Sequence, residues 1–82
     1  MRFSDLPRSY TQILEHGATQ ELFITQIEHE NCTVCVDFVM NEGLVEYQEV
    51  MTYEQGQNPY IGFPSSLCES VVETAILTHL NK

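Results

Sequence analysis

The chain has 82 residues, and its 12 Asp and Glu against 3 Lys and Arg give a net charge of −9 at pH 7. This length predicts a single domain, and the shortage of cations excludes direct binding to nucleic acid, whose phosphates are bound through Lys and Arg. No apolar run approaches the roughly 18–20 residues that cross a bilayer, so no membrane partner is expected. The odd number of cysteines, 3, favours a reduced, cytoplasmic setting over a secreted disulfide framework.

The segment before residue 18 is predicted to be an N-terminal helix. Ser4 or Asp5 would cap it, Pro7 would lie in its first turn, and Gly17 would end it. The apolar residues of the segment follow at helical spacing, and they are Leu6, Tyr10, Ile13 and Leu14.

Three consecutive strands are predicted next, because Val, Ile, Phe, Thr and Tyr fill the segments between two short breaks. The breaks are Glu30–Asn31 and Asn41–Gly43, whose Asn and Gly are typical of tight turns. The expected strands are Glu21–Glu30, Cys32–Met40 and Leu44–Tyr53.

Two-residue loops at Glu30–Asn31 and Glu42–Gly43 put one set of bulky side chains on the same face of the sheet. This inner face is expected to hold Phe23, Ile27, Val34, Phe38, Tyr47 and Met51. Glu49 then falls on the apolar side opposite Val36, and a β-bulge near Glu49–Val50 would remove it.

The other face of the sheet mixes carboxylates with apolar side chains, which is too much apolar surface to leave unused in a small protein. Either a terminal helix lies over this face, or the face binds a partner or a second copy. The candidate partner-binding residues are Glu28, Asp37, Glu42, Glu46, Leu22, Ile24, Val39 and Val50.

After the three strands, Gln55–Gly56 can turn a further hairpin with Tyr60–Phe63 as a short edge strand, or this segment is an ordered loop. A C-terminal helix is predicted to start at a capping box, with Ser66 as the N-cap and Glu69 reaching back. Its apolar stripe is expected to be Cys68, Val71, Val72, Ala75, Ile76, His79 and Leu80. The expected fold class is therefore α+β: an N-terminal helix, a three- or four-stranded antiparallel meander, and a C-terminal helix packed on the sheet.

Catalytic chemistry is not indicated, so we expect no enzyme, no cofactor and no metal. The Cys32-Thr-Val-Cys35 spacing matches a zinc knuckle, but Thr33–Val34 reads as strand, which turns the two thiols to opposite faces. No motif places a cysteine beside a histidine for nucleophilic attack.

The sequence favours a non-enzymatic protein-binding module, an inhibitor or adaptor directed at a basic, nucleic-acid-binding protein. By analogy alone, small acidic domains without catalytic groups include inhibitors that phages and other mobile elements direct at nucleic-acid enzymes. The alternative is a homodimeric small-ligand binder, and a zinc module is a third reading. A homodimer is expected because two short helices would leave the sheet partly uncovered. The candidate ligand-binding aromatics are Tyr47, Tyr53, Tyr60 and Phe63.

Overall fold

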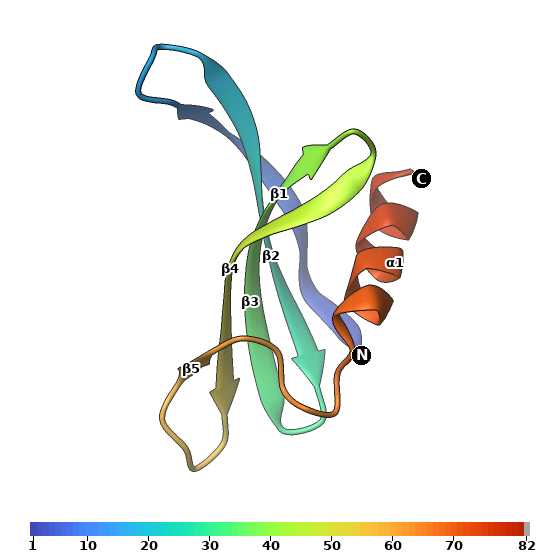
Figure 1. Cartoon of the computed structure of the whole chain (residues 1–82). Helices are drawn as coiled ribbons and strands as arrows, with labels where there is room; N and C mark the ends of the chain where they lie inside the picture. Colours follow the sequence, from blue (N-terminus) through green and yellow to red (C-terminus); the bar gives the residue numbers. More distant parts are fainter. Residues whose placement is uncertain (82) are drawn as a thin grey trace.

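The computed structural model describes residues 1–81 as one antiparallel sheet with a single helix on one of its faces (Figure 1). The strands follow one another as a simple meander, each pairing with the next along the chain. The elements are β1 (Arg2–Ile13), β2 (Thr19–His29), β3 (Cys32–Asn41), β4 (Leu44–Glu54), β5 (Tyr60–Ile61) and α1 (Glu69–Leu80).

The predicted N-terminal helix is wrong, because this segment is β1, which pairs antiparallel with β2. The supposed apolar stripe is largely exposed, with Leu6, Tyr10 and Ile13 all open to solvent. Pro7 lies in an irregularity of the pairing between Asp5 and Arg8, which an edge strand tolerates because its outer N–H groups have no ladder partner to lose. As β1, the segment pairs its backbone with β2, although these apolar side chains stay exposed.

Gly17 ends no helix but closes the turn between β1 and β2. Its N–H donates to the Leu14 carbonyl at 3.0 Å, and its φ of +84° is the left-handed conformation that glycine adopts without steric cost. His16, next to it, is an exposed residue of this turn.

The three central strands and both of their turns are confirmed within two residues. The predicted pairs Phe23 with Phe38 and Phe38 with Tyr47 lie opposite each other. In the second turn Glu42 and Gly43 have φ values of 54° and 81°, which is the geometry of a two-residue hairpin loop.

The β-bulge expected in β4 is present, with Gln48 as the extra residue. Tyr47 faces Phe38, whereas the next pair along the ladder is Glu49 with Asp37. This extra residue reverses the alternation of the rest of β4. Val50 therefore turns to the helix side, so its predicted place on the opposite face is wrong. Met51 turns away from the helix, so its predicted place on the inner face is wrong as well.

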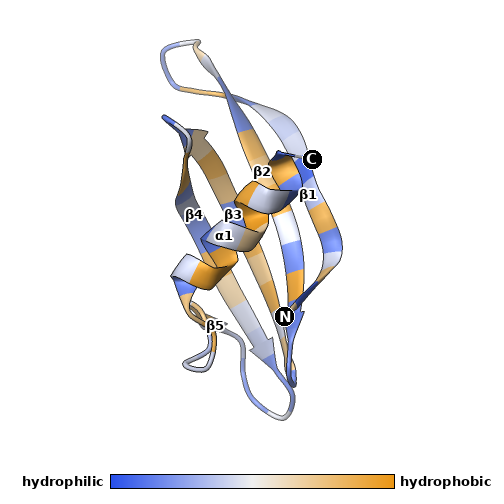
Figure 2. Cartoon of the chain, turned by 90° about the vertical axis from the view of Figure 1, so that its right-hand side faces the viewer, coloured by the Kyte–Doolittle hydropathy of each residue, from blue (hydrophilic) through white to orange (hydrophobic). Residues whose placement is uncertain are grey.

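The helix lies diagonally across one face of the sheet, as Figure 2 shows from the helix side. At its N-terminal end the Tyr47 hydroxyl of β4 donates to the Glu69 carbonyl at 2.9 Å, and at the other end His79 packs edge-on against Phe3 of β1 at 4.4 Å between ring centres. The core beneath it is built from Ile27, Cys32, Val34, Val36, Phe38, Val50, Leu67, Val72 and Ile76.

The predicted capping box is wrong, because α1 begins at Glu69 and its N-cap is Cys68, with no side-chain hydrogen bond at the cap. Residues 64–67 form a turn instead, closed by the Leu67 N–H donating to the Pro64 carbonyl at 3.0 Å. This turn places Leu67 in the core, and the predicted cap Ser66 lies 3.1 Å from His29 Nε2.

Of the two readings of the segment after β4, the short edge strand is confirmed over Tyr60–Ile61. The strand is held at its end by Gly62, whose N–H donates to the Val50 carbonyl at 2.8 Å and whose carbonyl accepts the Thr52 hydroxyl. The sole helix among residues 1–81, α1, has 12 residues, too few to cross a membrane.

Candidate protein-binding face

The face of the sheet turned away from α1, which we call the outer face, has no helix over it within residues 1–81 (Figure 1). It is formed by alternate residues of the strands, because successive side chains of a strand point to opposite sides. Of the two alternatives left open by the sequence, cover by a terminal helix is therefore wrong for the described chain.

Two carboxylates face each other at the centre of the outer face. Asp37 of β3 lies directly opposite Glu49 of β4. Burial raises the pKa of Asp37 above its ordinary value, and the charge of Glu49 raises it further. Within the described residues, neither carboxylate has an ion-pair partner.

The two arginines of the described chain are engaged elsewhere on the outer face. Arg2 forms an ion pair with Glu28, and the Arg8 guanidinium donates to Asp5 at 3.0 Å. In the row of residues that crosses the sheet, Ile24 stands between Arg8 and Asp37. The central carboxylates therefore remain without a compensating charge from β1.

Apolar side chains flank the two carboxylates. Ile24, opposite Asp37, is 37% exposed, and Ile61 of β5, opposite Met51, is 83% exposed. Tyr53 of β4 is also exposed and lies opposite Thr33. The centre of the outer face thus carries negative charge, and exposed apolar side chains lie on both sides of it. Such a surface can form contacts with another molecule.

The predicted partner-binding residues divide into those that reach this face and those that do not. Val50 is in the core, Val39 lies on the outer face opposite Glu46 but is only 1% exposed, and Glu42 lies at the tip of a turn, so these three do not contribute contact surface at the centre of the face. The predicted residues that the structure exposes, fully or partly, on the outer face are Leu22, Ile24, Glu28, Asp37 and Glu46.

Four residues of the outer face were not predicted from the sequence to belong to the partner-binding set. The register without a bulge placed Glu49 and Met51 inside, and neither Tyr53 nor Ile61 was assigned to the partner-binding set. The signal was present in the sequence, because a carboxylate opposite Val36 is unfavourable on an apolar face. A bulge before Glu49 reverses the alternation of side chains in the rest of β4, and it therefore predicts that Glu49, Met51 and Tyr53 all point outward.

The four predicted ligand-binding aromatics do not converge on one pocket. Tyr47 and Phe63 pack edge-on at 5.2 Å between ring centres and line a depression of about 510 Å³ beside Glu49 and Glu69. Tyr53 is on the outer face, whereas Tyr60 pairs with Thr52 on the helix side. Burial, helped by the nearby carboxylates of Glu73 and Glu69, raises the pKa of Tyr47, so its phenol stays neutral as a hydrogen-bond donor.

The three cysteines are free thiols in different environments. Cys32 is buried in the core, Cys35 accepts a hydrogen bond from Gln26 on the outer face at 3.5 Å, and Cys68 is exposed at the start of α1. The opposite orientation of Cys32 and Cys35 follows from their spacing in a strand. No group of three or more His, Cys, Asp or Glu is arranged to hold a metal ion in residues 1–81.

Comparison with protein families, with curated proteins and with solved structures gives no match to this chain.

Proposed function

We propose that this protein is a non-enzymatic binding module, an inhibitor or adaptor, that docks on a basic protein through the outer face of its sheet. The observation that carries the proposal is the pair Asp37 and Glu49, which within residues 1–81 has no ion-pair partner, lies among exposed apolar side chains and is on a face that no helix covers. A partner that offers Lys or Arg to this pair would relieve the repulsion between the two carboxylates.

The two kinds of side chain on the outer face would have different roles. The carboxylates would steer a basic partner and raise its rate of association, whereas Ile24, Met51 and Ile61 would supply most of the contact energy. The surface of a nucleic-acid-binding protein is a suitable partner, because it is rich in Lys and Arg for contact with phosphates.

The test compares two variants that change the net charge equally. Glu49→Lys alters the centre of the outer face, and Glu15→Lys alters an exposed turn on the same molecule. Proteins captured from the native host by the wild-type chain and by Glu15→Lys, but lost with Glu49→Lys, would support the proposal if they are basic. Their affinity should fall as salt is raised, because screening weakens the steering charges.

Equal capture by all three proteins, or binding that is unchanged between low and high salt, would remove the role of the acidic pair. A partner lost equally with both variants would indicate a response to net charge alone.

A second candidate function is binding of a small cationic or apolar ligand in the depression beside Tyr47 and Phe63. The aromatic rings and the carboxylates of Glu49 and Glu69 around it favour a cationic aromatic compound. A thermal-shift screen with such compounds should raise the unfolding temperature of the wild type and not of Phe63→Leu. A flat response from the wild type would count against this function.

A further inference from the structure

The strand β4 is paired along only part of the side that faces away from β3. Its neighbour on that side, β5, pairs with Met51 and Thr52, and the pairing ends where the Gly62 N–H donates to the Val50 carbonyl at 2.8 Å. Within residues 1–81, no strand lies beside residues 44–49 on this side (Figure 1). We call this unpaired stretch of residues 44–49 the β4 edge.

The β4 edge presents the backbone groups of Val45 and Tyr47. In an antiparallel ladder the N–H and C=O of one residue point to the same side, alternately toward and away from the partner strand. Val45 is turned away from β3, since its N–H donates to the Glu73 carboxylate of α1 at 3.0 Å. Tyr47, two residues further on, is turned the same way, and the described residues give its N–H no backbone partner.

A depression of about 510 Å³ lies beside the β4 edge. The strand contributes residues 47–50 to its lining, and the chain at the end of β5 contributes residues 61–63. An extended chain in this depression would continue the line of β5 along β4. Its alternate side chains would then point to the outer face and to the helix side, as they do in the other strands.

Carboxylates lie on both sides of the β4 edge. Glu49 reaches it from the outer face, and Glu69 borders the same depression from the helix side. The Glu73 carboxylate accepts the Val45 N–H, so it occupies the place that a carbonyl of an added strand would take. A Lys or Arg of that strand would attract the released carboxylate, whereas an acidic segment would be repelled from both sides.

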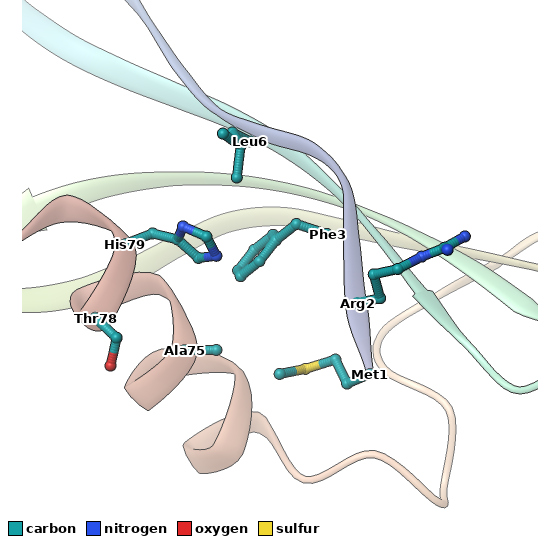
Figure 3. Close-up of a pocket in the computed structure, with 7 residues that line it drawn as sticks. All are labelled: Met1, Arg2, Phe3, Leu6, Ala75, Thr78 and His79. Carbon is teal, nitrogen blue, oxygen red and sulfur yellow. The ribbon is translucent and has the colours of Figure 1, made fainter. Parts of the chain in front are cut away.

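The arginines of the described chain lie at the opposite border of the sheet. Arg2 and Arg8 are both on β1, and Figure 3 shows Arg2 beside the depression between β1 and α1. The unpaired edge of β1 therefore carries both arginines, and the β4 edge carries carboxylates without one. This difference favours the β4 edge for a basic segment, and it disfavours a second copy of this chain, whose net charge is −9.

We propose that the β4 edge binds an extended segment of a basic protein, which adds to the sheet as a further strand. Its backbone would pair with Val45 and Tyr47, its apolar side chains would contact Phe63 on the helix side, and its Lys or Arg side chains would meet the carboxylates. This inference rests on the proposed function, because it names the part of the basic partner that is recognised. The added strand would lie next to Glu49 and would extend the outer face.

The first experiment uses a capped peptide of about eight residues, a common strand length, that alternates Lys and Val. Its affinity for the full chain is measured by fluorescence anisotropy at low salt, and a peptide with Glu in place of Lys is the charge control and should not bind. Two further peptides carry N-methyl groups on all Lys amides or on all Val amides. Only one of them loses the N–H groups that face the edge, since alternate residues point to the same side.

We expect one methylated peptide to bind at least about tenfold more weakly than the parent, because several hydrogen bonds are lost together, and the other to bind like the parent. Ionic attraction alone does not distinguish the two methylated peptides. Equal affinities of these two peptides, or no binding of the parent, would therefore overturn the proposal.

Amide hydrogen exchange shows where the peptide binds. Exchange of the Tyr47 amide should slow at least about tenfold when the Lys-Val peptide is bound. The Glu46 amide is the matched control, because it is turned toward β3 and should change little. An unchanged Tyr47 amide would overturn the proposal. Slowing that follows the protein concentration without peptide would overturn it as well, because it would assign the edge to a second copy.

Glu69→Lys separates the β4 edge from the centre of the outer face. It reverses a charge on the helix side of the depression, and it spares the Tyr47 hydrogen bond, which is made to the main-chain carbonyl of residue 69. We expect it to weaken peptide binding at least about fivefold, whereas Glu15→Lys, in an exposed turn, should bind like the wild type. Host proteins that are lost with Glu49→Lys but retained with Glu69→Lys would overturn strand addition and leave the proposed function standing.

Discussion

Asp37 and Glu49 show how a single pair of residues on the outer face affects the stability of the molecule. Burial and the facing carboxylate hold the pKa of Asp37 above its ordinary value of 3.8, so folding disfavours its charged form. A group whose pKa is raised in the folded state contributes stability below its unfolded pKa. That contribution is lost as the pH rises through its folded pKa.

We predict that Asp37→Asn stabilises the fold at pH 7 by about 0.5 kcal/mol, a modest value because the side chain is only partly buried. The gain should shrink as the pH falls toward 3.8 and below, where the wild-type carboxyl is itself neutral. Urea unfolding at neutral and acid pH measures both values. A gain of equal size at pH 3 would show that the charge is not its cause.

At the scale of the elements, the sequence predicts best where local and tertiary preferences agree. The strands β2, β3 and β4 consist of β-forming residues, and both breaks between them contain turn residues. One face of each strand is also apolar and suited to the core, so their pairing follows from the sequence. The strand β1 does not, because the spacing of Leu6, Tyr10 and Ile13 imitates a helix, while the pairing of this segment with β2 makes it an edge strand and leaves the three side chains exposed.

The start of α1 and the composition of the outer face depend in the same way on tertiary structure. Ser66 and Glu69 fit a capping box locally, but the turn at Pro64 that carries Leu67 into the core delays the helix to Glu69. The one-residue bulge at Gln48 then decides which side chains of β4 reach the candidate site. A register shift of one residue exchanges the two faces of a strand. A register predicted without the bulge therefore places both Val50 and Met51 on the wrong face.

The second hairpin turn offers a test of the element that fixes the register of β3 and β4. Glu42 holds a left-handed backbone, with φ of 54°, which is unfavourable for glutamate and tolerated by asparagine. Glu42→Asn should therefore stabilise the protein by about 0.5–1 kcal/mol, measured by urea unfolding. Unchanged or lower stability would indicate that Glu42 has a contact that outweighs its backbone strain.

The helix offers a second test, in two valines that are neighbours in sequence. Val72 of α1 is fully buried against the sheet, whereas Val71 is about half exposed on the solvent side of the same helix. Val72→Ala should cost about 1.5–3 kcal/mol of unfolding free energy, because it removes buried methyl groups and leaves a cavity. Val71→Ala serves as the control and should change the stability little, because this side chain is about half exposed. Similar losses in both variants would mean that α1 is rotated from the position described.

The whole molecule combines one covered face and one open face of the sheet with a large net negative charge. The helix closes the inner face, the outer face is open within residues 1–81, and the net charge is −9. The negative charge was plain from the sequence, but the openness of the outer face was not, because it depends on where both terminal segments pack.

Self-repulsion of the carboxylates should make the stability of the protein depend on salt. We predict that the unfolding temperature rises between low and moderate NaCl, since screening reduces repulsion more in the compact folded state than in the expanded chain. Differential scanning calorimetry at one dilute protein concentration and a series of NaCl concentrations checks this. A falling unfolding temperature would show that the ion pairs of Arg2 and Arg8 outweigh the repulsion.

The position of Arg2 and Arg8 on β1 has a practical consequence for experiments on this protein. Trypsin cuts after Lys and Arg, and the sequence contains neither between Ser9 and Asn81. Digestion would trim the first strand, removing Phe3 from beside His79, and would leave the rest intact whether folded or not. Resistance to trypsin is therefore no measure of folding here, and a protease that cleaves after glutamate or aromatic residues is the appropriate probe.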